Sequence, residues 1–184
     1  MLAEDVIGWI ATALSLIVFI APSAQFLNVI KGRLDYEDSP TVLIGTIYCN
    51  CLAWYSYGDI IFSNQMKTCN FIGFLISSLF IIIYLFYEVK KFLTDAILNA
   101  LIILSGSWAF YRALIYILAE PSTVGIVCTL TYLLALLYPL YLIYRVVKEK
   151  NYRLISYVVS GSSISSAVFW AIYGIMERDR KSVV

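Results

Sequence analysis

The sequence contains an inexact internal repeat, in which much of the first half of the chain returns in the second half. Three features recur after 116 or 117 residues, namely Gly8 at Gly125, Pro22 at Pro139, and WYSYG of 54–58 as WAIYG of 170–174. In a chain rich in apolar segments, such a repeat is typical of transporters whose substrate site lies between the two copies. The repeat therefore predicts two units of similar fold.

The composition is that of an integral membrane protein. Of the 184 residues, 61% are hydrophobic and 14% are charged, which is more apolar surface than a water-soluble domain of this size can bury. The net charge of +1, without a basic patch, argues against a nucleic-acid partner. The chain has no histidine, and its cysteines (Cys49, Cys51, Cys69 and Cys128) lie in apolar segments. We interpret them as packing thiols and predict no metal site, no cofactor and no enzyme activity.

Six apolar segments have the length of about 20 residues that a membrane-spanning helix needs. They cover residues 6–30, 40–62, 66–87, 96–119, 123–147 and 154–176. Most of the lysine and arginine residues lie in the loops after the first, third and fifth segments. The positive-inside rule therefore predicts that these loops are cytoplasmic and that the N-terminus lies outside the cell or in a lumen. Either the plasma membrane or an endomembrane fits this pattern.

The repeat divides the chain into three parts. Residues 1–90 form a first three-helix unit, residues 91–121 a linker helix, and residues 122–184 a second, incomplete unit of two helices. With three helices and one linker before the second copy, both units have the same orientation in the membrane. The predicted fold is an all-α integral membrane protein with two parallel three-helix-bundle repeats, the second truncated, and six transmembrane helices.

Two tryptophans occupy equivalent places in the two units. Trp54 and Trp170 each follow, after four residues, a small polar residue, which is Asn50 or Ser166. This spacing places both side chains on one face of a helix. Indole rings with polar neighbours suit a neutral polyhydroxylated ring, because their faces pack on C–H groups and the polar side chains bond its hydroxyls. Packing alone would explain one tryptophan, but for the pair we predict a ligand-binding role.

Asn70 and the prolines complete the candidate residues. An asparagine in an apolar span indicates either an interhelical hydrogen bond or a polar cavity, and both readings stay open here. Pro22 and Pro139 lie near the cytoplasmic ends of equivalent helices, and Pro40 near the cytoplasmic end of the second helix. A helix-interior proline removes a backbone hydrogen bond, and the resulting kink can act as a hinge. Ser156 stands at the place equivalent to Pro40.

These residues resemble those of the SWEET family of sugar facilitators, which are related to the PQ-loop proteins. The similar segments are FIAPSAQF at 19–26, Pro40 with Asn50, Trp54 and YG at 57–58, NFIG at 70–73, YPL at 138–140, VVKEK at 146–150 and WAIYG at 170–174. The resemblance covers every predicted span except the linker. It departs from the family in Ser156, where the fourth hinge proline is expected, and in the seventh helix and its asparagine, for which the sequence has no counterpart.

The resemblance implies a role for each candidate residue. Asn70 and Trp170 would contact the sugar, Asn50, Trp54 and Ser166 would line the pocket with Ser15 and Val18 as secondary positions, and Pro22, Pro40, Pro139 and Ser156 would occupy the hinge positions. Facilitated transport of mono- or disaccharides by alternating access, without ion coupling, is the implied activity. It agrees with the absence of Asp and Glu from the middle of the predicted spans.

Two alternatives remain open at the level of sequence. In the first, the chain is a truncated, non-transporting partner or regulator of a full-length relative. In the second, it is a PQ-loop carrier of, or a receptor for, another small solute. Expected partners are a small neutral sugar, the lipid bilayer, and another subunit in a homo- or hetero-oligomer.

Overall fold

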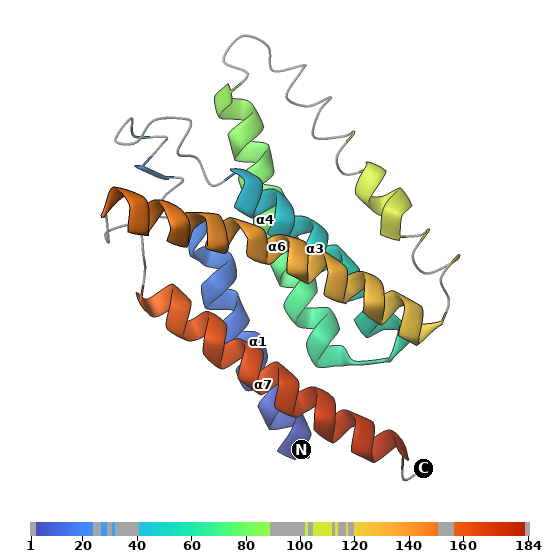
Figure 1. The fold of residues 1–184 in the computed structure, drawn as a ribbon. Coiled ribbons are helices and arrows are strands. Elements are labelled where there is room, and N and C mark those ends of the chain that lie inside the picture. The colour runs from blue at the N-terminus through green and yellow to red at the C-terminus, as the bar shows by residue number, and fades with distance from the viewer. Residues whose placement is uncertain are drawn as a thin grey trace.

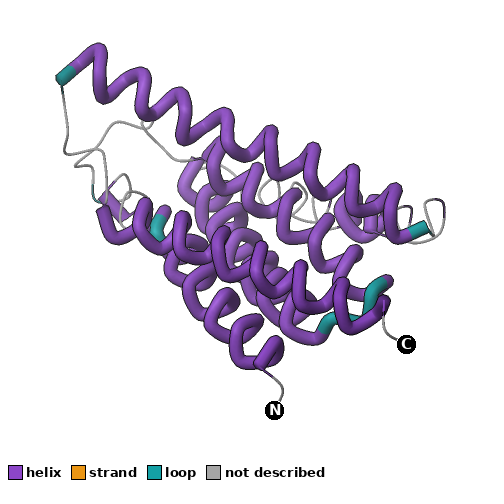
Figure 2. Tube along the Cα trace, turned by 60° about the horizontal axis from the view of Figure 1, so that its bottom comes forward, coloured by secondary structure: helices purple, strands orange, loops and turns teal. Residues whose placement is uncertain are grey.

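The computed structural model describes residues 3–23, 27–28, 31, 41–88, 102, 105–111, 113, 117, 120–150 and 157–182. Among these residues it contains helices and short turns and no strand (Figure 2). The described elements are α1 (Ala3–Ile20), α3 (Thr41–Ile60), α4 (Asn64–Glu88), α6 (Pro121–Glu149) and α7 (Tyr157–Ser182). The prediction of an all-α chain is confirmed. The complete six-helix arrangement stays a prediction, because the linker over 96–119 is described only in part.

Two helix ends differ from the predicted spans. Within the first predicted span, α1 ends at Ile20, where the backbone N–H of Ala21 bonds the carbonyls of both Ile17 and Val18 at 3.1 and 3.3 Å, and helical backbone resumes at residues 22–23 and 27–28. Pro22 follows directly and has no N–H for the ladder, which explains why the regular helix is interrupted at Ala21. At the other end of the chain α7 continues to Ser182, because hydropathy marks the membrane span and not the end of the helix.

The two predicted units contact one another through two helix pairs. In the first pair α1 packs against α7, and in the second α3 packs against α6; α4 packs against both α1 and α3. Figure 1 shows α1 in blue beside α7 in red, and α6 in orange across α3. By the repeat offset, α6 corresponds to α1 and α7 to α3. Each contact therefore joins the first helix of one unit to the second helix of the other.

A glycine lies against a tyrosine ring in each of these contacts. A Cβ atom added to Gly8 would lie 3.0 Å from the ring of Tyr173, and one added to Gly125 would lie 3.4 Å from the ring of Tyr57. The two pairs are equivalent in the repeat. The recurring glycine is therefore explained by the close approach of a ring from the other unit.

Two of the described helices are long and apolar enough to cross a membrane, over Ala3–Ile20 and Asn64–Leu85. The apolar part of α6, over Pro121–Leu134, is shorter. The helices α3 and α7 are 20 and 26 residues long, but Asn50 and five serines of residues 160–166 lower their mean hydropathy. Polar side chains of membrane helices are expected to face the bundle interior. We therefore look for the site between the helices.

The turn between α3 and α4 closes α3 with a Schellman motif. The N–H of Ser63 bonds the carbonyl of Gly58 at 2.9 Å, and the N–H of Phe62 bonds that of Asp59 at 3.3 Å. Phe62 has a φ of 58°, a left-handed conformation that glycine usually supplies at this place. The motif directs the chain so that Ser63 is buried while Phe62 is exposed.

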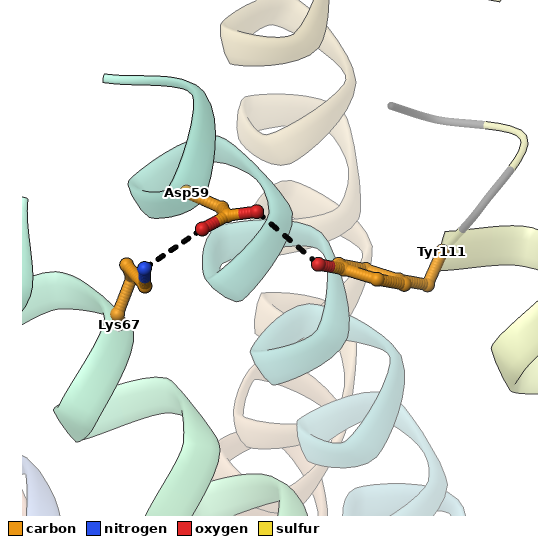
Figure 3. Close-up of polar contacts among 3 residues, drawn as sticks. All are labelled: Asp59, Lys67 and Tyr111. Atoms are coloured by element: carbon orange, nitrogen blue, oxygen red, sulfur yellow. Dashed lines mark hydrogen bonds and ion pairs between the residues drawn. The ribbon is translucent and has the colours of Figure 1, made fainter. Parts of the chain in front are cut away.

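The described part of the linker is attached to the first unit beside this turn. Asp59 at the end of α3 forms an ion pair with Lys67 of α4 at 2.7 Å and accepts a hydrogen bond from the hydroxyl of Tyr111 at 3.3 Å (Figure 3). The Tyr111 ring also lies 5.6 Å from the ring of Tyr55, between centroids. One carboxylate thus joins three segments at this end of the helices.

Candidate substrate site between the repeats

A polar cluster lies in the middle of the contact between α1 and α7. The indole N–H of Trp170 donates to Oγ of Ser15 at 3.0 Å, and the hydroxyls of Ser15 and Ser166 are 2.7 Å apart. The carbonyl oxygen of Ala11 lies 3.0 Å from Oγ of Ser15. Ser15 accepts from Trp170 and has one proton, which it donates either to the carbonyl of Ala11 or to Ser166, whose own hydroxyl lies 3.4 Å from the same carbonyl.

This cluster refines two of the predicted roles. Ser15 and Ser166 are both buried, so the structure brings these two predicted lining residues into direct contact. The indole N–H of Trp170 has Ser15 of the other unit as its hydrogen-bond partner. A ligand at Trp170 would therefore meet the ring rather than the N–H group, and the ring is held edge-on to Tyr173 at 5.5 Å between centroids.

The contact between α3 and α6 at the equivalent place is apolar. Trp54 packs against a fully buried core of Ala53, Val124 and Cys128, and its ring stands edge-on to that of Tyr57 at 5.7 Å. Cys128 occupies the place that Ala11 has in α1. The two tryptophans thus lie at equivalent contacts between the units, Trp170 in a polar setting and Trp54 in an apolar one.

Asn50 carries an unsatisfied acceptor. Its Oδ1 atom is buried and has no hydrogen-bond partner among the described residues. A buried carbonyl oxygen without a partner destabilises a structure by about 1–3 kcal/mol, so each such atom in a folded protein calls for an explanation. Asn50 lies one turn before Trp54 on α3. A ligand with a hydroxyl donor would satisfy this atom beside an aromatic ring.

Asn70 of α4 is also buried, and its Nδ2 group donates to the carbonyl of Met66 at 2.9 Å within the same helix. Close packing fixes α4 here, since a Cβ atom added to Gly73 would lie 2.6 Å from Sγ of Cys51 and from the ring of Phe19. Gly73 thus lets α4 approach both α1 and α3, and this close packing is the reason for glycine in the NFIG segment. Among the described residues no hydrogen bond joins Asn70 to Trp170, so the contact of Asn70 with a ligand stays a prediction.

The remaining candidates lie toward the other end of α1 or outside the described residues. Val18 is half-buried in the last turn of α1, and Pro22 is buried just beyond it. The backbone at Pro139 is helical within α6, which continues ten residues further, so the equivalent prolines differ in their effect on the helix. The side chain of Pro139, together with Pro40 and Ser156, lies outside the described residues.

One group of residues was not predicted to have a role. Ser63, Gln65, Asp5 and Tyr173 form hydrogen bonds at the end where α1 begins, and three of them are buried. Tyr173 belongs to the repeated WAIYG segment, which was a usable signal. Asp5 and Gln65 lie near the ends of apolar segments, where sequence reasoning assigns polar residues to water.

Comparison with known proteins assigns the chain to a family. The family described as "Sugar efflux transporter for intercellular exchange" matches residues 5–92 and 122–184. The chain is 27% identical to the bidirectional sugar transporter SWEET7 of Arabidopsis thaliana over 97% of its own length and 72% of the relative. It is 25% identical to the bidirectional sugar transporter SWEET15 of Oryza sativa subsp. indica over 94% of its own length.

The chain spans 55% of the length of that rice relative and 74% of the bidirectional sugar transporter SWEET1 of Arabidopsis thaliana, to which it is 27% identical. These relatives are named as transporters and not as enzymes, so the prediction of a transporter-family protein without enzyme activity is confirmed. The matched ranges and the shared motifs lead to one conclusion, which is that the chain belongs to the SWEET family.

Proposed function

We propose that this protein is a facilitative carrier of a neutral mono- or disaccharide, with the substrate bound between its two units. The observation that carries the proposal is the unsatisfied Oδ1 atom of Asn50 one turn from the Trp54 ring. Sugars combine hydroxyl donors with apolar C–H faces, and this pair of groups is suited to both.

The absence of charge from the middle of the described helices α1, α3, α4, α6 and α7 supports a neutral substrate. Residues 6–20, 41–58, 68–87, 121–144 and 157–176 contain no Asp, Glu, Lys, Arg or His. A charged solute would need a counter-ion in this low-dielectric region, and proton coupling would need a titratable carrier. A uniporter requires neither, so downhill transport is the proposed mode.

Alternating access requires that the two units move relative to one another while each stays intact. The contacts α1 with α7 and α3 with α6 support this proposal, because each crosses between the units at a glycine that admits a ring. Pro22, Pro40, Pro139 and Ser156 are proposed as the positions where the helices bend. The division into 1–90, 91–121 and 122–184 belongs to the same proposal, as does the N-terminus outside the cell or in a lumen.

Uptake of radiolabelled glucose and sucrose into proteoliposomes that contain only this chain tests the proposal. We expect saturable uptake that is the same with and without a proton gradient. Asn50→Ala should lower kcat/KM by roughly tenfold, the loss of one hydrogen bond of about 1–1.5 kcal/mol. Cys49→Ala, a change on the exposed neighbouring position, is the matched control and should leave uptake unchanged.

Two results would contradict the proposal. Equal uptake by the Asn50→Ala and Cys49→Ala variants would remove Asn50 from the site. An absence of uptake by a folded chain, shown by retained helix content, would favour a non-transporting partner of a longer relative. Uptake of another solute in place of sugars would favour the carrier of a different substrate.

A further inference from the structure

The last part of α6 has an exposed apolar face that ends in a lysine. Leu137, Leu140, Tyr141 and Tyr144 are each between 56% and 59% exposed, and they follow one another at spacings of three and four residues. Residues with this spacing lie on one side of a helix. Lys148 follows Tyr144 after four residues and is also exposed. We call these five residues the tyrosine face of α6.

The opposite side of α6 contacts the rest of the protein. Val124 and Cys128 are fully buried in the core cluster that includes Ala53 of α3, and Val146 is 2% exposed. With 3.6 residues per turn, these buried positions of α6 lie roughly opposite the tyrosine face. The tyrosine face is therefore directed toward lipid when the chain lies in a membrane.

The lysine of this face lies over an aromatic ring. Nζ of Lys148 is 5.6 Å from the centroid of the Tyr144 ring. At such a distance the π electrons of the ring attract the ammonium group. Side chains of a helix also point toward its N-terminus, so Lys148 lies back along α6 over the preceding turn. Its charge is thus held at the end of an apolar surface.

Electrostatics at the helix end explains the lysine but not the tyrosine. A positive charge in the last turn is favourable by itself, because it offsets the partial negative charge of the helix C-terminus. Lys31 occupies the equivalent place in the first unit, after the repeat offset of 117 residues. The place of Tyr144, in contrast, is taken there by Leu27. The combination of a cation with an aromatic ring is therefore specific to α6.

The charge around this end of α6 favours an anionic partner. Residues 145–150 carry three positive charges and one negative charge, a net charge of +2. Each lysine or arginine close to a membrane surface raises the affinity for anionic lipid by about fivefold. The predicted orientation places this end on the cytoplasmic side, where the anionic lipids of a membrane are concentrated. A tyrosine suits the same level, because its ring is apolar and its hydroxyl donates hydrogen bonds.

We propose that the tyrosine face of α6 binds a phospholipid whose headgroup has a net negative charge. The ammonium of Lys148 pairs with the phosphate, and the hydroxyls of Tyr141 and Tyr144 donate to oxygens of the headgroup. An acyl chain lies along Leu140 and Leu137. This inference goes beyond the proposed function, because it does not require that the chain transport sugar.

Native mass spectrometry of the full chain in a mild nonionic detergent tests the proposal. The protein is titrated with dioleoylphosphatidylglycerol or with zwitterionic dioleoylphosphatidylcholine, and the Kd of the first bound lipid is measured. For the unsubstituted chain we expect the Kd of phosphatidylglycerol to be at least about fivefold lower than that of phosphatidylcholine.

Three variants locate the site. Lys148→Gln should raise the Kd of phosphatidylglycerol by about fivefold and leave that of phosphatidylcholine unchanged. Tyr144→Leu, which copies Leu27 of the first unit, should raise it by about two- to fivefold, because the contact between cation and ring is lost. Lys31→Gln removes the same charge at the equivalent place without a tyrosine, and as the matched control it should change the Kd by less than about twofold. Circular dichroism checks that all three variants keep their helix content.

Three results would overturn the proposal. In the first, Lys31→Gln and Lys148→Gln raise the Kd equally, so that the attraction comes from net charge at any place. In the second, the unsubstituted chain binds both lipids with the same Kd. In the third, inorganic phosphate competes as strongly as phosphatidylglycerol, so that the site needs no acyl chain. Lipid selectivity in a folded chain that takes up no sugar would sustain the lipid site and refute the proposed function.

Discussion

Gly8 and Gly125 occupy equivalent places in the two contacts between the units, yet a methyl group has different room at each. At Gly8 the added carbon would lie 3.0 Å from both Gln65 and the Tyr173 ring, which is tighter than an ordinary contact. At Gly125 its nearest neighbour would be the Tyr57 ring at 3.4 Å. The substitution Gly→Ala at both sites therefore compares crowding while the chemical change is the same.

Two effects of a glycine-to-alanine change on the free energy of unfolding oppose one another. Alanine stabilises a helix interior by up to about 1 kcal/mol relative to glycine. Overpacking at Gly8 is expected to destabilise the protein by about 1–3 kcal/mol, because two side chains have to shift. The Gly8→Ala variant should thus lose up to about 2 kcal/mol, whereas Gly125→Ala should be neutral or gain up to about 1 kcal/mol.

Unfolding by sodium dodecyl sulfate in mixed micelles, followed by the helix signal in circular dichroism, measures both free energies against the unsubstituted protein. The quantity of interest is the difference between the two variants, expected at about 1–3 kcal/mol. A loss for Gly125→Ala that equals or exceeds the loss for Gly8→Ala would refute the reasoning. The two contacts would then not differ in the way the structure shows.

Three further outcomes follow from the described contacts. Ser15→Ala leaves the indole N–H of Trp170 without its partner and should destabilise the protein by about 1–3 kcal/mol. In a Trp170→Phe background the same substitution should have a smaller effect, and a double-mutant cycle measures this coupling. Gly73→Ala places a carbon 2.6 Å from Sγ of Cys51 and should destabilise by about 1–3 kcal/mol in thermal unfolding, with partial recovery when Cys51→Ala is added. Phe62→Gly removes a left-handed conformation from a residue with a side chain and should raise stability by about 1 kcal/mol; a loss in the same assay would show that the exposed ring contributes to stability.

The sequence allowed some features of this structure to be predicted because they depend on local pattern. Apolar runs identified the described helices, and the repeat offset led to the equivalence of Gly8 with Gly125 before any contact was known. The interruption of the first span at Ala21 is local too: α1 ends at Ile20 and helical backbone resumes at residues 22–23 and 27–28, because Pro22 lacks an N–H for the hydrogen-bond ladder while the apolar run continues.

Other features depend on how one helix is rotated against another, which pattern does not specify. Ser15 was expected on a lining face, but its bond to Trp170 follows from the register of α1 with α7. The bond from Gln65 to Asp5 crosses sixty residues of chain and joins side chains that local reasoning assigns to water. The left-handed conformation of Phe62 could not be predicted either, since glycine is the residue that usually indicates such a turn.

The contacts of α1 with α7 and of α3 with α6 have a consequence for biosynthesis. The segment that leaves the ribosome first contains α1, α3 and α4, and α4 already joins the other two. The surface of α1 around Gly8 packs against α7, and the surface of α3 around Tyr57 packs against α6. Both of these partner helices are synthesised last. Because each surface recognises a different late helix, two separately translated halves of this chain should be able to find one another in the same membrane and assemble without the covalent connection.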